Sequence, residues 1–218
     1  MNKKDILIIC ALEQEVNGEL DDYLPDPRQI IYTGVGKVNA TGQLTERLHS
    51  SHLNCLPPMP KLVINYGTAG SRELPIGELV DCTKFIQRDM DVTGLGFMKG
   101  QTPFEQEVPM ILDYDHVQFN PIGKKLRCGT GDNFVQDSMG SYSDVYDMEA
   151  YALAKVCFVY DVPFISFKYI TDNVDEHSAG DWEENCSNGI TEFKERILSQ
   201  LNWWLVIMRL ISTYEREY

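Results

Sequence analysis

The sequence predicts an α/β fold, a single domain over residues 1–218 with a central mixed β-sheet flanked by helices. Short apolar runs such as residues 6–12 alternate with segments of helical spacing, which is typical of strands covered by helices. Several runs end in turns rich in Gly, Asp, Glu or Thr, where open α/β sheets bind ligands. No repeat or low-complexity tract divides the chain, so we expect one domain.

The individual elements follow from local patterns. Continuous apolar or β-branched runs predict strands over residues 6–12, 29–33, 61–66, 78–87, 125–129 and 162–170. Helical spacing predicts helices over residues 37–48 and 145–160 and a long terminal helix over about 189–215. The terminal helix carries Trp203, Trp204 and Leu205 and is too apolar to face water. We expect it to pack on the sheet, with a partner-chain contact as the alternative.

Composition and charge restrict the function. Hydrophobic residues make up 43% and charged residues 24% of the chain, as in ordinary globular proteins. With 33 acidic and 19 basic residues the net charge is −14, which argues against nucleic-acid or anionic-membrane partners. The first apolar stretch ends in Glu13 and Glu15 rather than in a cleavage site. We therefore expect a cytoplasmic protein with a small-molecule substrate.

Metal and nucleotide motifs are incomplete. The six cysteines form no C-x-x-C pair, and His49 and His52 lack a third ligand at usable spacing, so neither a metal nor a cofactor is expected. Gly34-Val-Gly-Lys37 begins like a dinucleotide fingerprint but has Asn39 where a third Gly or Ala belongs. A tight strand-to-helix turn explains these glycines better.

Three carboxylates stand near predicted strand ends or helix starts. Glu15 follows the first strand, Glu149 lies early in an Ala-rich helix and Asp172 follows the last strand. Each alone is explained by helix capping or by the helix dipole. Together they are more informative, because three sheet ends of an α/β domain can converge on one cleft.

Seven motifs occur in a fixed order along the chain. They are Ala11-Leu-Glu-Gln-Glu-Val16, Gly34-Val-Gly-Lys-Val-Asn-Ala40, Ile64-Asn-Tyr-Gly-Thr-Ala-Gly70, Asp89-Met-Asp-Val-Thr93, Gly131-Asp-Asn-Phe-Val135, Asp147-Met-Glu-Ala150, and Val162-Pro-Phe with Ile170-Thr-Asp172. In this order they resemble the nucleoside phosphorylase and nucleosidase superfamily, most closely the 5′-methylthioadenosine/S-adenosylhomocysteine nucleosidases. The resemblance implies a nucleoside phosphorylase-like fold, a homodimer and cleavage of a purine N-glycosidic bond.

The resemblance also implies roles for individual residues. Asp172 would protonate the leaving purine, Glu15 would position and deprotonate the attacking water, and Glu149 would accept hydrogen bonds from the ribose hydroxyls. The implied substrate-binding residues are Met148 beneath the ribose, Phe134 and Val135 at the base, Thr68, Ala69 and Gly70 along the pocket, Lys168 near the water, and Thr171. Leu12, Trp182 and Phe97 are candidates for pocket walls or lids, and core packing explains them equally well.

The expected activity is hydrolysis of 5′-methylthioadenosine or S-adenosylhomocysteine with release of adenine. The loop over residues 11–16 is acidic and lacks arginine, so it would repel phosphate and suits water. Three alternatives remain. One is a nucleosidase for another 5′-modified nucleoside such as futalosine, because residues 16–31 and 100–121 are shorter than is usual for the family. The second is a nucleoside phosphorylase, against which the missing arginine in the first loop argues. The third is an inactive nucleoside-binding protein, because Lys168 stands where the family carries arginine and the same two segments are short.

Overall fold

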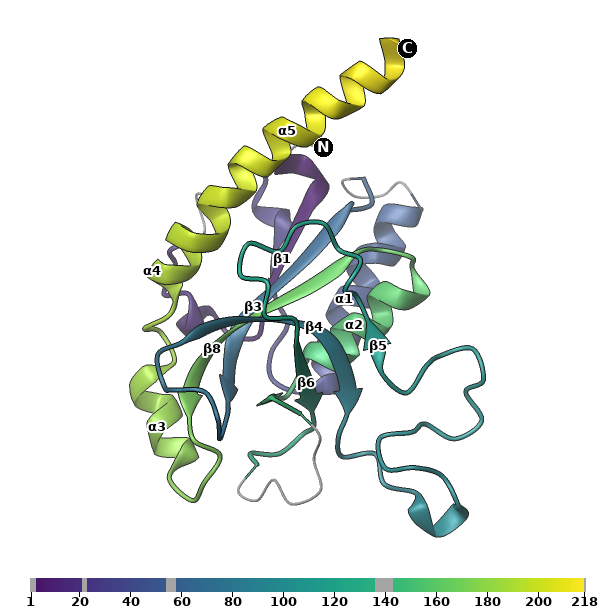
Figure 1. The fold of residues 1–218 in the computed structure, drawn as a ribbon, viewed down its shortest axis with the longest axis vertical. Helices are drawn as coiled ribbons and strands as arrows, with labels where there is room; N and C mark the ends of the chain where they lie inside the picture. The colour runs from purple at the N-terminus through teal and green to yellow at the C-terminus, as the bar shows by residue number, and fades with distance from the viewer. Residues whose placement is uncertain (1–2, 21–22, 54–57, 136–142, 218) are drawn as a thin grey trace.

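The computed structural model describes residues 3–20, 23–53, 58–135 and 143–217. They contain an eight-stranded mixed sheet (Figure 1). Its strands are β1 (Ile6–Cys10), β2 (Ile30–Tyr32), β3 (Leu62–Gly70), β4 (Leu79–Gln87), β5 (Leu112–Asp113), β6 (Leu126–Thr130), β7 (Val145–Asp147) and β8 (Phe164–Asp172). The helices are α1 (Lys37–His52), α2 (Ala150–Val159), α3 (Ser178–Asn185), α4 (Ile190–Phe193) and α5 (Ser199–Glu217). The predicted fold class, a mixed sheet flanked by helices, is confirmed.

Part of the sheet closes on itself. β3 pairs with β8 in parallel, β8 with β4 antiparallel, β4 with β6 in parallel, β6 with β7 in parallel, and β7 with β3 antiparallel. β1 and β2 extend the sheet beyond β3 through parallel pairs. The parallel alignment brings the carboxyl ends of β1, β3 and β8 to the same side, where the chain leaves each strand through a loop.

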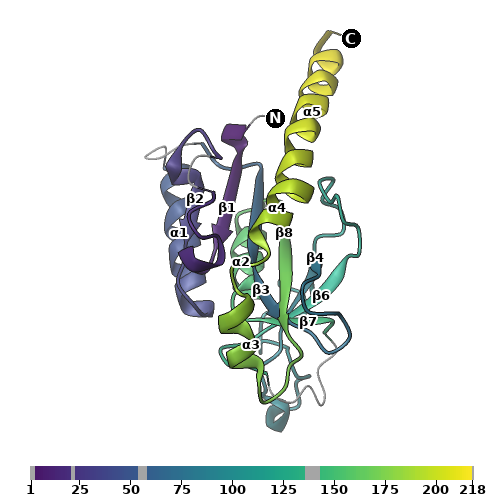
Figure 2. The same ribbon diagram turned by 90° about the vertical axis from the view of Figure 1, so that its left-hand side faces the viewer.

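Two hydrophobic cores lie on opposite faces of the sheet. Along β1, Leu7 and Ile9 join one core with α1 and α2, whereas Ile6, Ile8 and Cys10 join the other with α4 and α5. This alternation is the period of two of a strand that is covered on both faces. Figure 2 shows α1 on one side of β1 and α5 on the other.

Several predicted boundaries are wrong. β3 continues to Gly70 and β8 to Asp172, beyond the expected ends at residues 66 and 170. Two further differences are informative. Residues 145–160 were expected to form one helix, but Val145–Asp147 is strand β7 and α2 begins only at Ala150. Val145 pairs with Cys128 of β6 and Tyr146 with Gly70 of β3, so sheet pairing overrides the local helical pattern. The first strand was expected to reach residue 12. It ends at Cys10, because Glu13–Glu15 forms a single 3₁₀ turn.

The terminal helical segment packs on the sheet over its first half, as predicted. It runs through α4, a π-helical turn over Lys194–Leu198, and α5. Phe193, Leu201 and Leu205 are buried in the core that faces β8. Trp203 on the outer side is 71% exposed, and α5 continues past the body of the molecule (Figure 1). Within the described residues no helix has both the length and the apolar character needed to cross a bilayer.

Candidate active site

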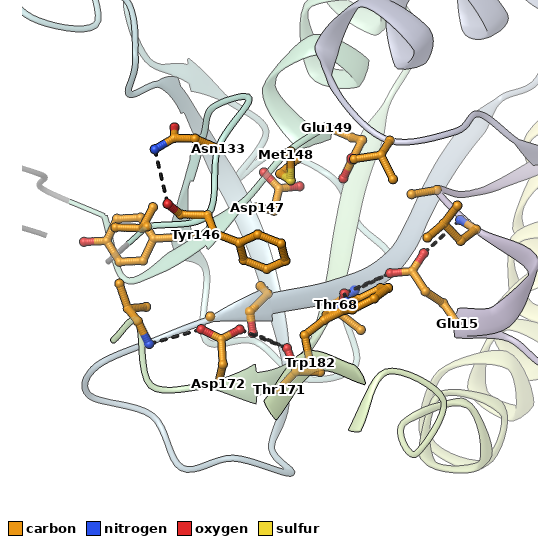
Figure 3. Close-up of a pocket in the computed structure, with 18 of the residues that line it drawn as sticks. Glu15, Thr68, Asn133, Tyr146, Asp147, Met148, Glu149, Thr171, Asp172 and Trp182 are labelled. Atoms are coloured by element: carbon orange, nitrogen blue, oxygen red, sulfur yellow. Dashed lines mark hydrogen bonds between the residues drawn. The ribbon is translucent and has the colours of Figure 1, made fainter. Parts of the chain in front are cut away.

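A cavity of about 250 Å³ opens at the carboxyl ends of β1, β3 and β8 (Figure 3). Its volume lies just below the roughly 300–1,000 Å³ that is typical of small-molecule sites. Most of the site residues expected from the sequence line it: Leu12, Glu15, Thr68, Ala69, Gly70, Phe134, Val135, Met148, Glu149, Thr171, Asp172 and Trp182. The chain thus brings together residues that are up to 170 positions apart, as expected if the strand ends converge.

Glu15 is held at one end of the cavity by three hydrogen bonds. The Leu12 amide donates to its Oε2 at 3.1 Å, and the Thr68 amide and hydroxyl both donate to Oε1 at 2.9 Å. The side chain is only 3% exposed. Gly67 favours this placement, because a Cβ there would stand 3.3 Å from the Glu15 Oε1 atom, a tight contact. The result is an oriented carboxylate that can accept a proton from a water molecule.

Asp172, the last residue of β8, lies at the other end of the cavity. Its Oδ1 accepts the Val174 amide at 3.1 Å, and the Thr171 hydroxyl donates to its Oδ2 at 3.1 Å. A Cβ at Gly70 would overlap the Asp172 Oδ1 atom, so only glycine at this position leaves room for the carboxyl group. Figure 3 shows Asp172 and Glu15 on opposite sides of Thr68, with both side chains at the cavity.

Glu149 precedes α2 and is 7% exposed. Its Oε1 accepts the Gly36 amide at 2.8 Å. Gly34 and Gly36 both have positive φ angles, 79° and 93°, so the predicted tight turn is confirmed and its purpose is to aim this amide at the carboxyl group. Burial and the nearby charge of Asp147 raise the pKa of Glu149 from 4.5 to about 8. The environment of Glu149 therefore favours the protonated form of its carboxyl group near neutral pH.

Lys168 does not line the cavity. It is 1% exposed, and its Nζ atom lies 2.8 Å from Asp147 Oδ2. Burial works against both charges, yet the pairing lowers the pKa of Asp147 and raises that of Lys168. Asp147 also accepts the Thr130 hydroxyl at 2.5 Å and the Ala150 amide at 2.8 Å. The Lys168 ammonium group is thus paired with a residue that lines the cavity, and it lies on the same side of Gly67 as Glu15.

The loop after β6 supplies the aromatic wall. Phe134 is 46% exposed at the cavity mouth and lies next to Val135. Arg88 fixes this loop, because its guanidinium donates to the Asn133 side-chain and backbone oxygens at 3.0 and 2.5 Å and to the Gly131 carbonyl at 3.3 Å. A half-exposed aromatic ring on a fixed loop can stack on a flat heterocycle.

Sequence reasoning missed several cavity residues and misplaced two, Lys168 and Phe97. Arg88, Asn133, Tyr146 and Val174 line the cavity. Arg88 directly follows β4, so the rule that strand ends carry function could have found it. Phe97 does not reach the cavity and packs edge-on against Phe104 at 5.4 Å.

Metal-binding potential can be judged from the side chains themselves. Over the described ranges, no cluster of three or more His, Cys, Asp or Glu residues could hold a metal ion. The described cysteines, Cys10, Cys82, Cys128, Cys157 and Cys186, are free thiols. Cys55 lies outside the described residues.

Known proteins resemble this chain in sequence and in fold. The family model described as the phosphorylase superfamily matches residues 24–120 and 133–201. A 5′-methylthioadenosine/S-adenosylhomocysteine nucleosidase from Haemophilus ducreyi is 30% identical over 191 residues, covering 79% of each chain.

Two solved structures have the same fold. One is the 5′-methylthioadenosine/S-adenosylhomocysteine nucleosidase from Neisseria meningitidis in complex with methylthio-immucillin-A. Its TM-score is 0.71 at 21% identity, and the match covers 90% of this chain and 98% of that one. The other is the futalosine hydrolase of Helicobacter pylori (TM-score 0.70, 19% identity, 89% and 97%). The resemblance seen in the seven motifs is thereby confirmed: this chain belongs to the phosphorylase superfamily.

Proposed function

We propose that this protein is a purine nucleosidase that hydrolyses the N-glycosidic bond of 5′-methylthioadenosine or S-adenosylhomocysteine and releases adenine. The observation that carries the proposal is the convergence of Glu15, Glu149 and Asp172 on one cavity that also holds an aromatic wall. The nucleosidase relatives named above support the choice of substrate.

The three carboxyl groups suit the two ends of the breaking bond. As the bond between ribose C1′ and the purine breaks, positive charge grows on the ribose and negative charge on the base. Asp172 donates a proton to the purine nitrogen, and water adds to C1′ while Glu15 takes the proton that the water gives up. The products are adenine and the free sugar. Glu149 accepts hydrogen bonds from the ribose hydroxyls and, once ionised, stabilises the cationic sugar.

Water is favoured over phosphate as the nucleophile. A phosphate site needs cationic side chains, and Arg88 is the one arginine among the described residues that line the cavity. Its guanidinium already donates to Asn133 and Gly131. The end of the cavity near Glu15 is anionic and would repel phosphate.

We further propose a homodimer in the cytoplasm. Large apolar side chains are exposed on the described part of the chain, including Val38 at 81%, Leu95 at 71% and Phe104 at 85%. Burial of such side chains against a second copy of the chain would stabilise a dimer. The free cysteines fit a reducing compartment. Analytical ultracentrifugation of Phe104→Asp tests the dimer, since this charge would shift the protein to a monomer.

Adenine release from both substrates, with and without phosphate, tests the proposed reaction. Asp172→Asn keeps the shape of the acid but removes its proton donor, and we expect a loss of at least about 10²-fold in kcat. Asp113→Asn, at an exposed position on β5 away from the cavity, is the matched control and keeps full activity. Release that requires phosphate would indicate a phosphorylase. Binding without release would indicate an inactive nucleoside-binding protein, and release only from other nucleosides in a panel would move the proposal to a different 5′ group.

A further inference from the structure

Trp182 of α3 is joined to Glu15 by a chain of hydrogen bonds. Its indole nitrogen lies 2.9 Å from Thr68 Oγ1, and the same hydroxyl lies 2.9 Å from Glu15 Oε1. Figure 3 shows the three side chains side by side at one end of the cavity. Among the described residues the hydrogen bonds to Glu15 come from Leu12 and Thr68, so a hydrogen-bonding effect of Trp182 on Glu15 passes through the Thr68 hydroxyl.

The direction of this chain is fixed by donor and acceptor chemistry. An indole N–H can only donate, so the Thr68 oxygen must accept from Trp182. A hydroxyl has a single hydrogen, and its remaining partner here is the Glu15 carboxylate. The Thr68 hydrogen is thus aimed at Oε1, and successive hydrogen bonds of this kind strengthen one another.

The chain of hydrogen bonds also determines which Glu15 oxygen can accept a further hydrogen bond. Oε1 accepts two bonds, from the Thr68 amide and the Thr68 hydroxyl, whereas among described residues the Leu12 amide alone donates to Oε2. Oε2 therefore keeps the greater capacity to accept a bond from water. Because α3 also contacts β8 through Asn185, whose amide donates to the Thr171 carbonyl at 3.3 Å, Trp182 sits on an element tied to both ends of the cavity.

We propose that Trp182 is a positioning residue that orients the Thr68 hydroxyl and thereby holds Glu15 in the geometry of a base. The kinetic part of this inference rests on the proposed hydrolysis. The hydrogen-bond part is independent of the hydrolysis, because the bonds from Trp182 to Thr68 and from Thr68 to Glu15 need no substrate.

Kinetics of a double-mutant cycle test the catalytic consequence. Trp182→Phe keeps an aromatic wall but removes the donor, and we expect kcat to fall roughly 5- to 10-fold while KM changes less than about twofold. In a Thr68→Val background, which has no hydroxyl to orient, the same substitution should change kcat by less than about twofold. Trp203→Phe makes the same chemical change at a position that is 71% exposed on α5, and leaves the kinetics unchanged. Equal losses in both backgrounds, or a rise in KM at constant kcat, would show that Trp182 is only a wall.

Replacement of Trp182 by benzothienylalanine guards against a packing artefact. The analogue keeps both rings and exchanges the N–H for sulfur, so it should reproduce the kcat of Trp182→Phe. A wild-type rate with this analogue would overturn the proposal.

An NMR measurement tests the chain without activity. The three tryptophans give three indole N–H signals, which single Trp→Phe variants assign. The Trp182 signal should move upfield by several tenths of a ppm in Thr68→Val and shift in Glu15→Gln, whereas the Trp203 signal should not move. A Trp182 signal insensitive to Thr68→Val would refute the chain even in an active enzyme. A sensitive signal in a protein without hydrolase activity would instead refute the proposed function alone.

Discussion

The raised pKa of Glu149 predicts a stability that depends on pH in a defined window. In the folded protein its pKa is about 8, because burial and Asp147 oppose the negative charge, whereas its ordinary value is 4.5. Between these two values the unfolded chain has lost the proton that the folded protein still holds. Because the unfolded state binds fewer protons there, the free energy of unfolding falls as pH rises.

The size of the effect follows from the shift. Each pKa unit corresponds to about 1.4 kcal/mol, so the shift costs up to about 5 kcal/mol of stability once the pH exceeds the folded value. Glu149→Gln removes the charge but keeps an oxygen that can accept the Gly36 amide. The variant should match the wild type near pH 4.5, gain stability over it progressively up to about pH 8, and keep a constant advantage above that.

Urea unfolding of both proteins at several pH values between 4.5 and 9 measures this difference directly. The difference between variant and wild type is the relevant quantity, since the titrating groups distant from Glu149 contribute equally to both and cancel. Glu13→Gln, at an exposed position in the 3₁₀ turn after β1, is the control. Its free energy of unfolding should stay within about 0.5 kcal/mol of the wild-type value. A difference that is flat with pH, or a variant that is less stable at pH 8, would refute the reasoning.

Three further substitutions test other parts of the site. Lys168→Met leaves the buried Asp147 carboxylate unpaired and should destabilise the protein by about 3–5 kcal/mol, which a lower melting temperature would show. Adding Asp147→Asn to this variant should largely restore the melting temperature. An unchanged melting temperature in Lys168→Met would contradict a buried ion pair. Gly70→Ala places a Cβ where the Asp172 carboxyl group lies, and should lower kcat by about 10²-fold. Circular dichroism checks that the variant is folded. Full activity in this variant would show that Asp172 is not the acid. Arg88→Met frees the loop that carries the aromatic wall and should raise KM about 10-fold with a smaller change in kcat, whereas an unchanged KM would exclude base binding by that loop.

The sequence predicted the fold class because its signals are local and strong. The continuous apolar pattern of β1 and β3, covered on both faces, and the glycine turn before α1 can be read without tertiary context. The rule that ligands bind at strand ends placed Glu15 and Asp172 in one cavity, although 157 positions separate them. The seven ordered motifs supplied the family.

Features that depend on tertiary pairing could not be predicted from the sequence. Residues 145–147 form a strand only because β6 and β3 offer open edges. The Lys168–Asp147 pair joins two strands across 21 positions, and no spacing rule predicts it. Trp182 could be proposed as a pocket lid, but its bond to Thr68 depends on where α3 docks.

The central claim is that the cavity uses water to break a purine N-glycosidic bond, and the sugar product tests it most directly. Purified protein is incubated with 5′-methylthioadenosine in phosphate buffer, and the products are identified by mass spectrometry and ³¹P NMR. We predict adenine and free 5-methylthioribose in equal amounts with no phosphate consumed. The appearance of a sugar 1-phosphate, or nucleoside binding without any adenine, would contradict the account.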